Sequence, residues 1–221
     1  MNKIKGFFYF IFCVVTIFLV IVAMKLNNKN NHRQRQIWAK FQRYFIGYKL
    51  EQIGEFAADV DMLVLNHKSM LDIIILEEIY PGNLAWVAKK EIGEIKVLGA
   101  ILRLPKMIAI DRSNPRSIVQ LVKDAKDRLE NGRVIAIFPE GTRGKSDKLL
   151  KFHDGAKILA TKLNLRIQPV VLKNTLEHLD VKNLSVKGGL IKAKILPPIA
   201  PNSDDWYAKL REDMQKAYDE L

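Results

Sequence analysis

Six short apolar runs constrain the fold of this chain more than any other feature. They cover residues 60–66, 84–89, 107–111, 134–139, 166–172 and 190–196, and segments with helical spacing separate them. Runs of this length, without clean polar alternation, suit strands that are buried on both faces. The sequence therefore predicts an α/β fold, in which helices flank a mostly parallel sheet.

Two of the intervening helices carry clear signals. Asn114 and Pro115 form a cap and a first-turn proline, an apolar stripe follows, and Gly132 ends the pattern. The tail from Asp204 predicts a final helix that packs one face on the sheet. That face consists of Trp206, Leu210, Met214, Ala217 and Tyr218.

A third helical pattern lies nearer the amino end, within residues 33–56. Its apolar stripe has spacings of three and four and consists of Ile37, Trp38, Phe41, Tyr44, Phe45 and Tyr48. The pattern predicts an amphipathic helix. Its aromatic face suits either the protein core or a membrane interface, so both placements stay open.

Before this helix, the run from Phe7 to Met24 contains no charged residue. As a helix it would extend about 27 Å, close to the hydrocarbon thickness of a bilayer. A cleaved secretory signal is the alternative, but the apolar run is long for a signal peptide. A small-x-small cleavage site is also missing, because Ile21 and Ala23 are followed by Met24 and Lys25. The sequence predicts an uncleaved amino-terminal membrane helix, which either spans the bilayer or lies in one leaflet.

Basic residues follow this run in excess, among them Lys25, Lys29, Arg33 and Arg35. The positive-inside rule then places the rest of the protein on the cytoplasmic face of the membrane. In a bacterium, this would be the inner membrane. The formal net charge of +12 favours an anionic partner, which is a lipid surface, a phosphorylated small molecule or nucleic acid. We expect a membrane anchor at 1–30, an interfacial or packing helix region at 31–58 and a catalytic domain at 59–221.

His67 and Asp72 are the first candidates for chemistry. His67 follows a predicted strand, and ligand sites of open parallel sheets lie at the carboxyl ends of strands. Asp72 would fall in the first turn of the next helix, where its carboxylate can orient the imidazole as a general base. Alternatively, Ser69 to Asp72 forms a capping box and His67 is an ordinary loop residue.

A second candidate loop, residues 138–144, follows the run at 134–137. Pro139 and Gly141 break the strand into a tight turn, which can direct Thr142, Arg143 and backbone amides at one point. Arg143 can bind a phosphate group with two hydrogen bonds. The alternative is an ordinary polar turn with a solvated arginine.

The two candidate loops together resemble the signature motifs of the glycerol-phosphate and lysophosphatidate acyltransferase family. The motifs are NHKSMLD at 66–72 and FPEGTR at 138–143. VAKKE at 87–91, IAIDR at 108–112 and IQPVVLKNT at 167–175 are similar to the family's other conserved regions. The resemblance covers about residues 60–175 and implies a glycerol-3-phosphate acyltransferase-like domain.

The resemblance also implies the roles of individual residues. His67 would be the general base and Asp72 its orienting carboxylate. Further residues would form the acceptor phosphate site: Glu140, Gly141, Thr142, Arg143, Arg112 and Lys89. The expected reaction is acyl transfer from a thioester to the sn-2 hydroxyl of 1-acylglycerol 3-phosphate, which makes phosphatidate. Lys68 departs from the family pattern, since polar uncharged residues are common at that position.

The remaining expectations concern donors, partners and alternatives. The donor would be acyl-ACP or acyl-CoA, with no cofactor and no metal, and the partners would be membrane lipids and lysophosphatidate rather than nucleic acid. The single cysteine, Cys13, allows neither a disulfide nor a zinc cluster. One alternative is an O-acyltransferase for glycerol 3-phosphate or another lysolipid. The other is a non-catalytic basic protein that binds membranes or nucleic acid.

Overall fold

The computed structural model describes residues 2–111, 114 and 116–221. The longer helices are α1 (Asn2–Leu26), α2 (Asn31–Ile46), α3 (Leu71–Ile79), α6 (Ser117–Glu130), α7 (Asp154–Leu163) and α9 (Trp206–Glu220). Short helical turns are η1 (Asn28–Asn30), α4 (Lys90–Glu94), α5 (Ala100–Arg103) and α8 (Thr175–His178). The strands are β1 (Tyr48–Ile53), β2 (Met62–Leu65), β3 (Leu84–Lys89), β4 (Ile108–Ile110), β5 (Val134–Ile137), β6 (Ile167–Lys173), β7 (Leu179–Asp180), β8 (Ser185–Val186) and β9 (Gly189–Ile195).

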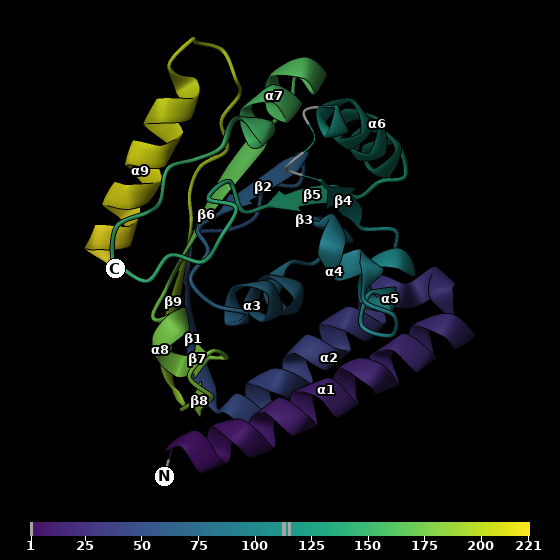
Figure 1. Cartoon of the computed structure of the whole chain (residues 1–221). Coiled ribbons are helices and arrows are strands. Elements are labelled where there is room, and N and C mark those ends of the chain that lie inside the picture. The colour runs from purple at the N-terminus through teal and green to yellow at the C-terminus, as the bar shows by residue number, and fades with distance from the viewer. Residues whose placement is uncertain (1, 112–113, 115) are drawn as a thin grey trace.

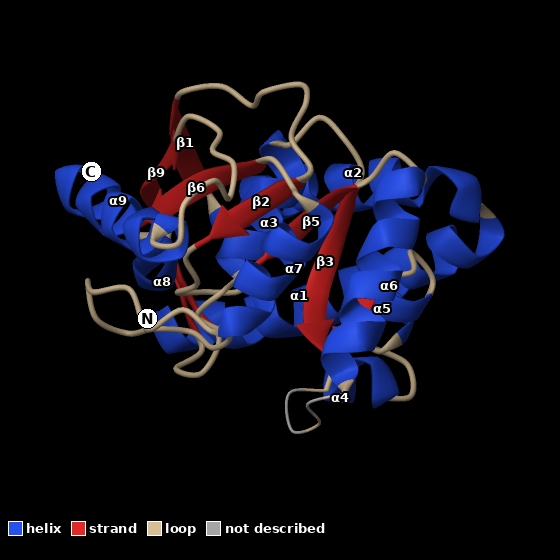
Figure 2. Ribbon diagram, turned by 90° about the horizontal axis from the view of Figure 1, so that it is seen from above, coloured by secondary structure: helices blue, strands red, loops and turns tan. Residues whose placement is uncertain are grey.

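The described strands form one large sheet in the order β1-β9-β6-β2-β5-β3-β4, with β7 and β8 as a separate hairpin. The five strands from β6 to β4 are parallel, whereas β9 runs antiparallel to β6 and pairs in parallel with β1. Helices cover both faces of the sheet (Figures 1 and 2). All six predicted strand runs are confirmed, and so is the α/β fold.

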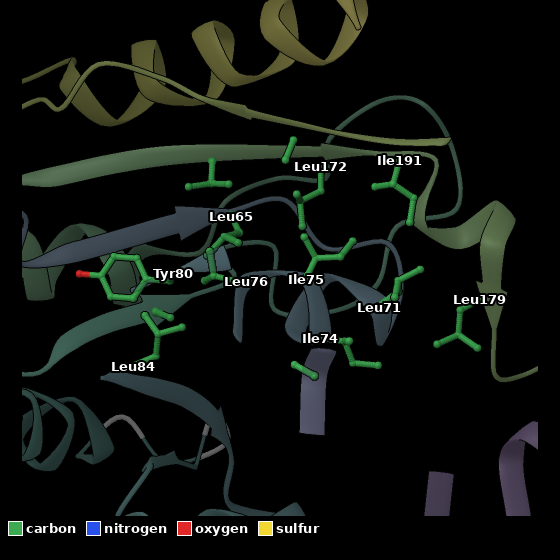
Figure 3. Close-up of a cluster of buried hydrophobic side chains, with 14 of the residues drawn as sticks. Leu65, Leu71, Ile74, Ile75, Leu76, Tyr80, Leu84, Leu172, Leu179 and Ile191 are labelled. Atoms are coloured by element: carbon green, nitrogen blue, oxygen red, sulfur yellow. The ribbon is translucent and has the colours of Figure 1, made fainter. Parts of the chain in front are cut away.

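Alternate side chains of the central strands supply two separate cores. On β2, Leu63 and Leu65 pack toward α3, α2 and α1, whereas Met62 and Val64 pack toward α6, α7 and α9. Figure 3 shows the first core, in which Ile75 of α3 lies toward Leu65 and Leu172 of the sheet and Ile74 lies on the other side of the helix. Burial on both faces explains why these strands read as continuous apolar runs.

The two helices with clear sequence signals are confirmed. Helix α6 begins at Ser117 and ends at Glu130, two residues before Gly132. The predicted start is wrong in detail, because the N-cap residue is Arg116 and not Asn114. Asn114 accepts a hydrogen bond from the backbone N–H of Arg116 at 3.0 Å, and Pro115 lies outside the described residues. The predicted inner face of α9 is buried in the second core, as the apolar spacing requires.

The prediction of one helical pattern through residues 33–56 is wrong at its end. Helix α2 stops at Ile46 because Gly47 adopts a left-handed conformation with φ of 77°, which glycine reaches without a steric penalty. Residues 48–53 then form β1, which pairs with β9 over its whole length. Tyr48 thus belongs to the sheet, where its side chain is buried, and not to the helical stripe.

Helices α1 and α2 form a hairpin beneath α3 (Figure 1). Thr16 Oγ1 of α1 accepts hydrogen bonds from Trp38 Nε1 at 3.1 Å and from Gln42 Nε2 at 3.0 Å. The Tyr9 hydroxyl donates to Gln42 Oε1 at 2.8 Å. Residues 4–26 of α1 are long and apolar enough to cross a membrane, yet one side of this helix is buried against the protein.

The aromatic stripe of α2 faces outward. Its exposed members are Ile37, Phe41, Tyr44 and Phe45, and the buried positions of α2 are Arg35, Ala39, Gln42 and Ile46. On α1 the exposed residues include Phe7, Phe8, Val14, Val15, Phe18 and Leu19. The hairpin therefore presents a broad apolar surface, a feature that marks interaction sites and membrane contacts in proteins.

Candidate active site

Three predicted site segments meet at one edge of the sheet because β2, β5 and β3 are neighbouring parallel strands. His67 follows β2, Glu140 follows β5, and Lys89 is the last residue of β3. The carboxyl ends of these strands point the same way (Figure 2). This edge is where open parallel sheets place their ligand sites.

His67 and Asp72 are in direct contact. The Nδ1 atom of His67 lies 2.9 Å from Oδ2 of Asp72, and the Asp72 side chain is fully buried. The His67 side chain keeps 12% of its surface exposed. With Nδ1 held by the carboxylate, Nε2 is the ring nitrogen that remains to accept a proton from a substrate hydroxyl.

The same carboxylate also caps the start of α3. Oδ2 of Asp72 accepts the backbone N–H of Lys68 at 2.6 Å and that of Ser69 at 2.8 Å. The Ser69 hydroxyl accepts the N–H of Leu71 at 3.1 Å. Capping and orientation of His67 are therefore performed by one side chain, so the two interpretations of this motif do not exclude each other.

Two residues that sequence reasoning missed hold the histidine loop from either side. The ring of Phe138 stacks on the His67 imidazole, with centroids 3.9 Å apart and an angle of 13° between the planes. Asn66 is fully buried and pairs with Leu172 of β6 through Nδ2–H···O and N–H···Oδ1 bonds of 2.8 Å each. Asn66 directly follows a predicted buried strand, and a buried amide side chain requires hydrogen-bond partners. This position could have indicated a structural role for Asn66.

Glu140 is buried beneath the same loop. One carboxylate oxygen accepts the backbone N–H of His67 at 2.7 Å, and the other accepts the N–H of Leu150 at 2.8 Å. Burial raises the pKa of the Glu140 carboxyl, and the two backbone N–H groups oppose this shift. Glu140 therefore ties the His67 loop to the loop of residues 141–152.

We expect Glu140→Gln to lower both activity and stability. A glutamine side chain can accept only one of the two N–H bonds, and its own NH₂ group faces the other N–H. Leaving a buried donor unsatisfied costs about 1–3 kcal/mol. The displaced His67 loop should lower kcat by about tenfold or more, since small misplacements are costly in catalysis.

Acyl-transfer kinetics and thermal unfolding check the Glu140→Gln prediction. The matched control is Glu130→Gln at the exposed end of α6, which should leave both quantities unchanged. Wild-type kcat in Glu140→Gln would show that the carboxylate does not position His67.

The loop after Glu140 presents the predicted phosphate ligands. Gly141 has φ of 68°, a conformation that strains other residues, and Thr142 and Arg143 beyond it are exposed. Lys89 is exposed at the end of β3 and lies opposite Ile110 of β4. The predicted ligand Arg112 lies outside the described residues.

Lys68 has a defined place that its sequence position did not reveal. Its side chain is buried, and Nζ donates to the carbonyl oxygens of Ser146 at 2.8 Å and Lys148 at 3.0 Å. Burial lowers the pKa of the Lys68 ammonium, which nearby carboxylates oppose. The ammonium also lies 5.5 Å from the ring centroid of Tyr218 on α9. Lys68 thereby links the histidine loop to the loop after Arg143.

The comparisons with known proteins agree with this geometry. The family model described as Acyltransferase matches residues 59–173, which include both candidate loops. A 1-acyl-sn-glycerol-3-phosphate acyltransferase of Helicobacter pylori is 39% identical over 98% of this chain and 93% of its own length. This chain belongs to the acyltransferase family.

Other relatives share the acyltransferase domain within longer chains. An enzyme of the same name from Cocos nucifera is 33% identical, and the match covers 69% of this chain but 49% of the coconut protein. The crystal structure of the 1-acyl-sn-glycerophosphate acyltransferase of Thermotoga maritima superimposes with a TM-score of 0.77 and 22% identity. That match covers 100% of this chain and 99% of the Thermotoga chain, so the fold is shared from end to end.

Proposed function

We propose that this acyltransferase transfers a fatty acyl group from a thioester to the sn-2 hydroxyl of 1-acylglycerol 3-phosphate and so makes phosphatidate. The observation that carries the proposal is the His67–Asp72 contact of 2.9 Å at the carboxyl edge of the sheet. Exposed Lys89 and Arg143 at this edge supply positive charge for an acceptor phosphate. The name of the Helicobacter relative supports the same reaction.

The reaction needs only one proton to be taken and returned. Nε2 of His67 accepts the proton of the acceptor hydroxyl as its oxygen attacks the thioester carbonyl carbon. Asp72 stabilises the resulting imidazolium through Nδ1. When the carbon–sulfur bond breaks, the thiolate takes the proton from Nε2, an ester remains on the acceptor, and His67 is neutral again.

The acceptor phosphate is held by the groups around this edge. We assign direct contacts to Arg143, Thr142 and Lys89 and to the backbone of Gly141, and the family resemblance adds Arg112, which lies outside the described residues. Glu140 contributes through the loops it holds, because its carboxylate is engaged with two backbone N–H groups and would repel a phosphate. The donor is an acyl-ACP or acyl-CoA thioester, and both carriers are anionic, which suits the net positive charge of the chain.

The side-on packing of α1 supports a placement within one leaflet. Its polar contacts with α2 run along the helix, and α2 itself carries Lys40 and Arg43. A hairpin with an apolar outer face and charged flanks lies in the membrane interface rather than across the bilayer. The cytoplasmic location of the domain stays a prediction from the sequence.

Acceptor competition with purified protein tests the function. Labelled acyl-CoA and acyl-ACP are each supplied with lysophosphatidate, glycerol 3-phosphate and lysophosphatidylcholine. We expect transfer to lysophosphatidate to prevail. Preference for another acceptor would favour the related O-acyltransferase, and no transfer from either donor to any acceptor would favour the non-catalytic alternative.

Arg143→Lys tests the phosphate contact. Lysine keeps the charge but loses the planar two-donor geometry, so we expect the KM for lysophosphatidate to rise about tenfold with little change in kcat. The control is Arg166→Lys, since Arg166 precedes β6 at the opposite edge of the sheet and pairs with Asp59. An unchanged KM in Arg143→Lys would remove Arg143 from the acceptor site.

A further inference from the structure

The segment of residues 92–97, between β3 and β4, exposes three aliphatic side chains. Ile92, Ile95 and Val97 are 43%, 48% and 53% exposed. Outside α1, α2 and this segment, the other large exposed hydrophobic residues that the structure describes are Ile53, Val119 and Leu190, each on a different element. Scattered single residues need no explanation, whereas a cluster of three indicates a contact surface.

This segment leads into α5, which packs on α1. On one flank of the apolar face of α1, Phe12 stacks on Phe45 of α2 with centroids 3.9 Å apart. On the other flank, Ile21 packs in one buried cluster with Ala100 of α5. Because successive helix residues are rotated by about 100°, Phe12 and Ile21 lie on opposite sides of exposed Phe18.

Helix α5 therefore packs against α1, and α4 in turn contacts α5. The Asn28 side chain after α1 also donates to the carbonyl oxygen of Leu104 at 3.1 Å, which fixes α5 to the hairpin. The exposed aliphatic residues of 92–97 thus directly precede a helix that is fixed to the hairpin.

Charge around the segment identifies its occupant as an anionic lipid surface. Five basic and two acidic residues lie between positions 89 and 106. Lys90 and Lys96 are exposed beside the aliphatic residues, where Lys90 pairs with exposed Glu94 at 3.6 Å. Arg103 donates to the carbonyl oxygens of Gly93 and Lys96, which holds the segment in shape. Aliphatic side chains bordered by lysines are typical of segments that enter the headgroup region.

We propose that residues 92–97 form a third membrane contact, which brings the lipid surface to the entrance of the active site. The inference rests on the proposed placement of α1 and α2 in the interface. Helix α4 begins directly after Lys89, at the sheet edge that carries His67. A lysophosphatidate molecule can then pass sideways from the bilayer to His67 while its acyl chain stays in lipid.

Site-specific fluorescence tests this contact in the full chain. In a Cys13→Ala background, single cysteines replace Ile95, Phe18 or Val119 and carry a polarity-sensitive dye. Vesicles contain equal parts of phosphatidylethanolamine and phosphatidylglycerol. We expect blue-shifted emission and protection from iodide quenching at positions 95 and 18, and neither change at position 119, which lies on α6 away from the hairpin.

The possible outcomes distinguish the membrane contact of residues 92–97 from the membrane placement of α1 and α2. A dye that responds at position 18 but not at 95 overturns the third contact and leaves the hairpin in the membrane. No response at 18 or 95 overturns both placements, while acyl transfer by the same labelled proteins tests the function independently. A response at 95 to acyl carrier protein, but not to vesicles, overturns the lipid contact in favour of carrier docking.

Activity provides a second readout. The triple variant Ile92→Ser/Ile95→Ser/Val97→Ser should lose about tenfold or more of its activity on lysophosphatidate in vesicles, since three aliphatic groups no longer enter lipid. Its activity on a short-chain, monomeric lysophosphatidate should match the wild type. The control triple is Ile53→Ser/Val119→Ser/Leu190→Ser, which removes exposed aliphatic residues elsewhere. Equal losses on both substrates, or in both triples, would contradict the contact.

Discussion

Replacing His67 by alanine should lower kcat for acyl transfer by about 10³-fold or more, because the acceptor hydroxyl loses its general base. The side chain lies at the sheet edge with one ring nitrogen held by Asp72 at 2.9 Å, so no other described group is placed to substitute for it in the same position. The measurement is single-turnover transfer from a labelled thioester to lysophosphatidate.

Two variants accompany His67→Ala. His153→Ala changes an exposed histidine before α7 and should retain wild-type activity. Asp72→Asn should lower kcat by about 10²-fold or more, since an amide cannot stabilise the imidazolium as a carboxylate does. Asp72 also caps α3, so its thermal unfolding is recorded as well. Retained activity in His67→Ala with the fold intact would refute the mechanism.

The largest expected effect on stability comes from Glu77. This buried carboxylate of α3 pairs with Arg35 of α2 and accepts a hydrogen bond from Trp86 Nε1 at 2.8 Å. Burial raises the pKa of the Glu77 carboxyl, although Arg35 opposes the shift. Glu77→Ala leaves the Arg35 charge buried without its partner, which costs about 3–5 kcal/mol of unfolding free energy.

Denaturant unfolding of the detergent-solubilised protein checks the Glu77 prediction. Glu130→Ala, which removes an exposed partner of Lys126, should change stability by less than about 0.5 kcal/mol. The double variant Arg35→Leu/Glu77→Leu should be more stable than Glu77→Ala, because the Arg35 charge is no longer buried without its partner. A Glu77→Ala loss no greater than that of Glu130→Ala would show that this pair does not hold the hairpin on the domain.

Much of the fold was accessible from local patterns. Strands buried on both faces need continuous apolar runs, so the strands that flank His67 and Glu140 could be recognised without tertiary information. The residues at their carboxyl ends could be expected to meet, because neighbouring parallel strands end at one edge. The order of the strands in the sheet could not be derived, because a short apolar run does not indicate which strand it pairs with.

The carboxyl-terminal end of the hairpin shows where local patterns fail. Tyr48 continues the helical spacing of α2, yet Gly47 ends the helix and the next residues become β1. The strand exists because β9 offers a free parallel edge, and that partner lies about 140 residues later in the chain. A strand conformation that depends on a partner far away in the chain cannot be predicted from the neighbouring residues alone.

Residue type and short-range spacing were enough to predict the α/β class, the apolar amino-terminal helix and the motif pair of the acyltransferase family. Three features became visible only in the folded structure: Asp72 both caps α3 and orients His67, Glu140 and Lys68 hold the loops, and α1 lies along the domain. These depend on which surfaces meet when the sheet forms, and such contacts are set by packing between segments that are far apart in the chain.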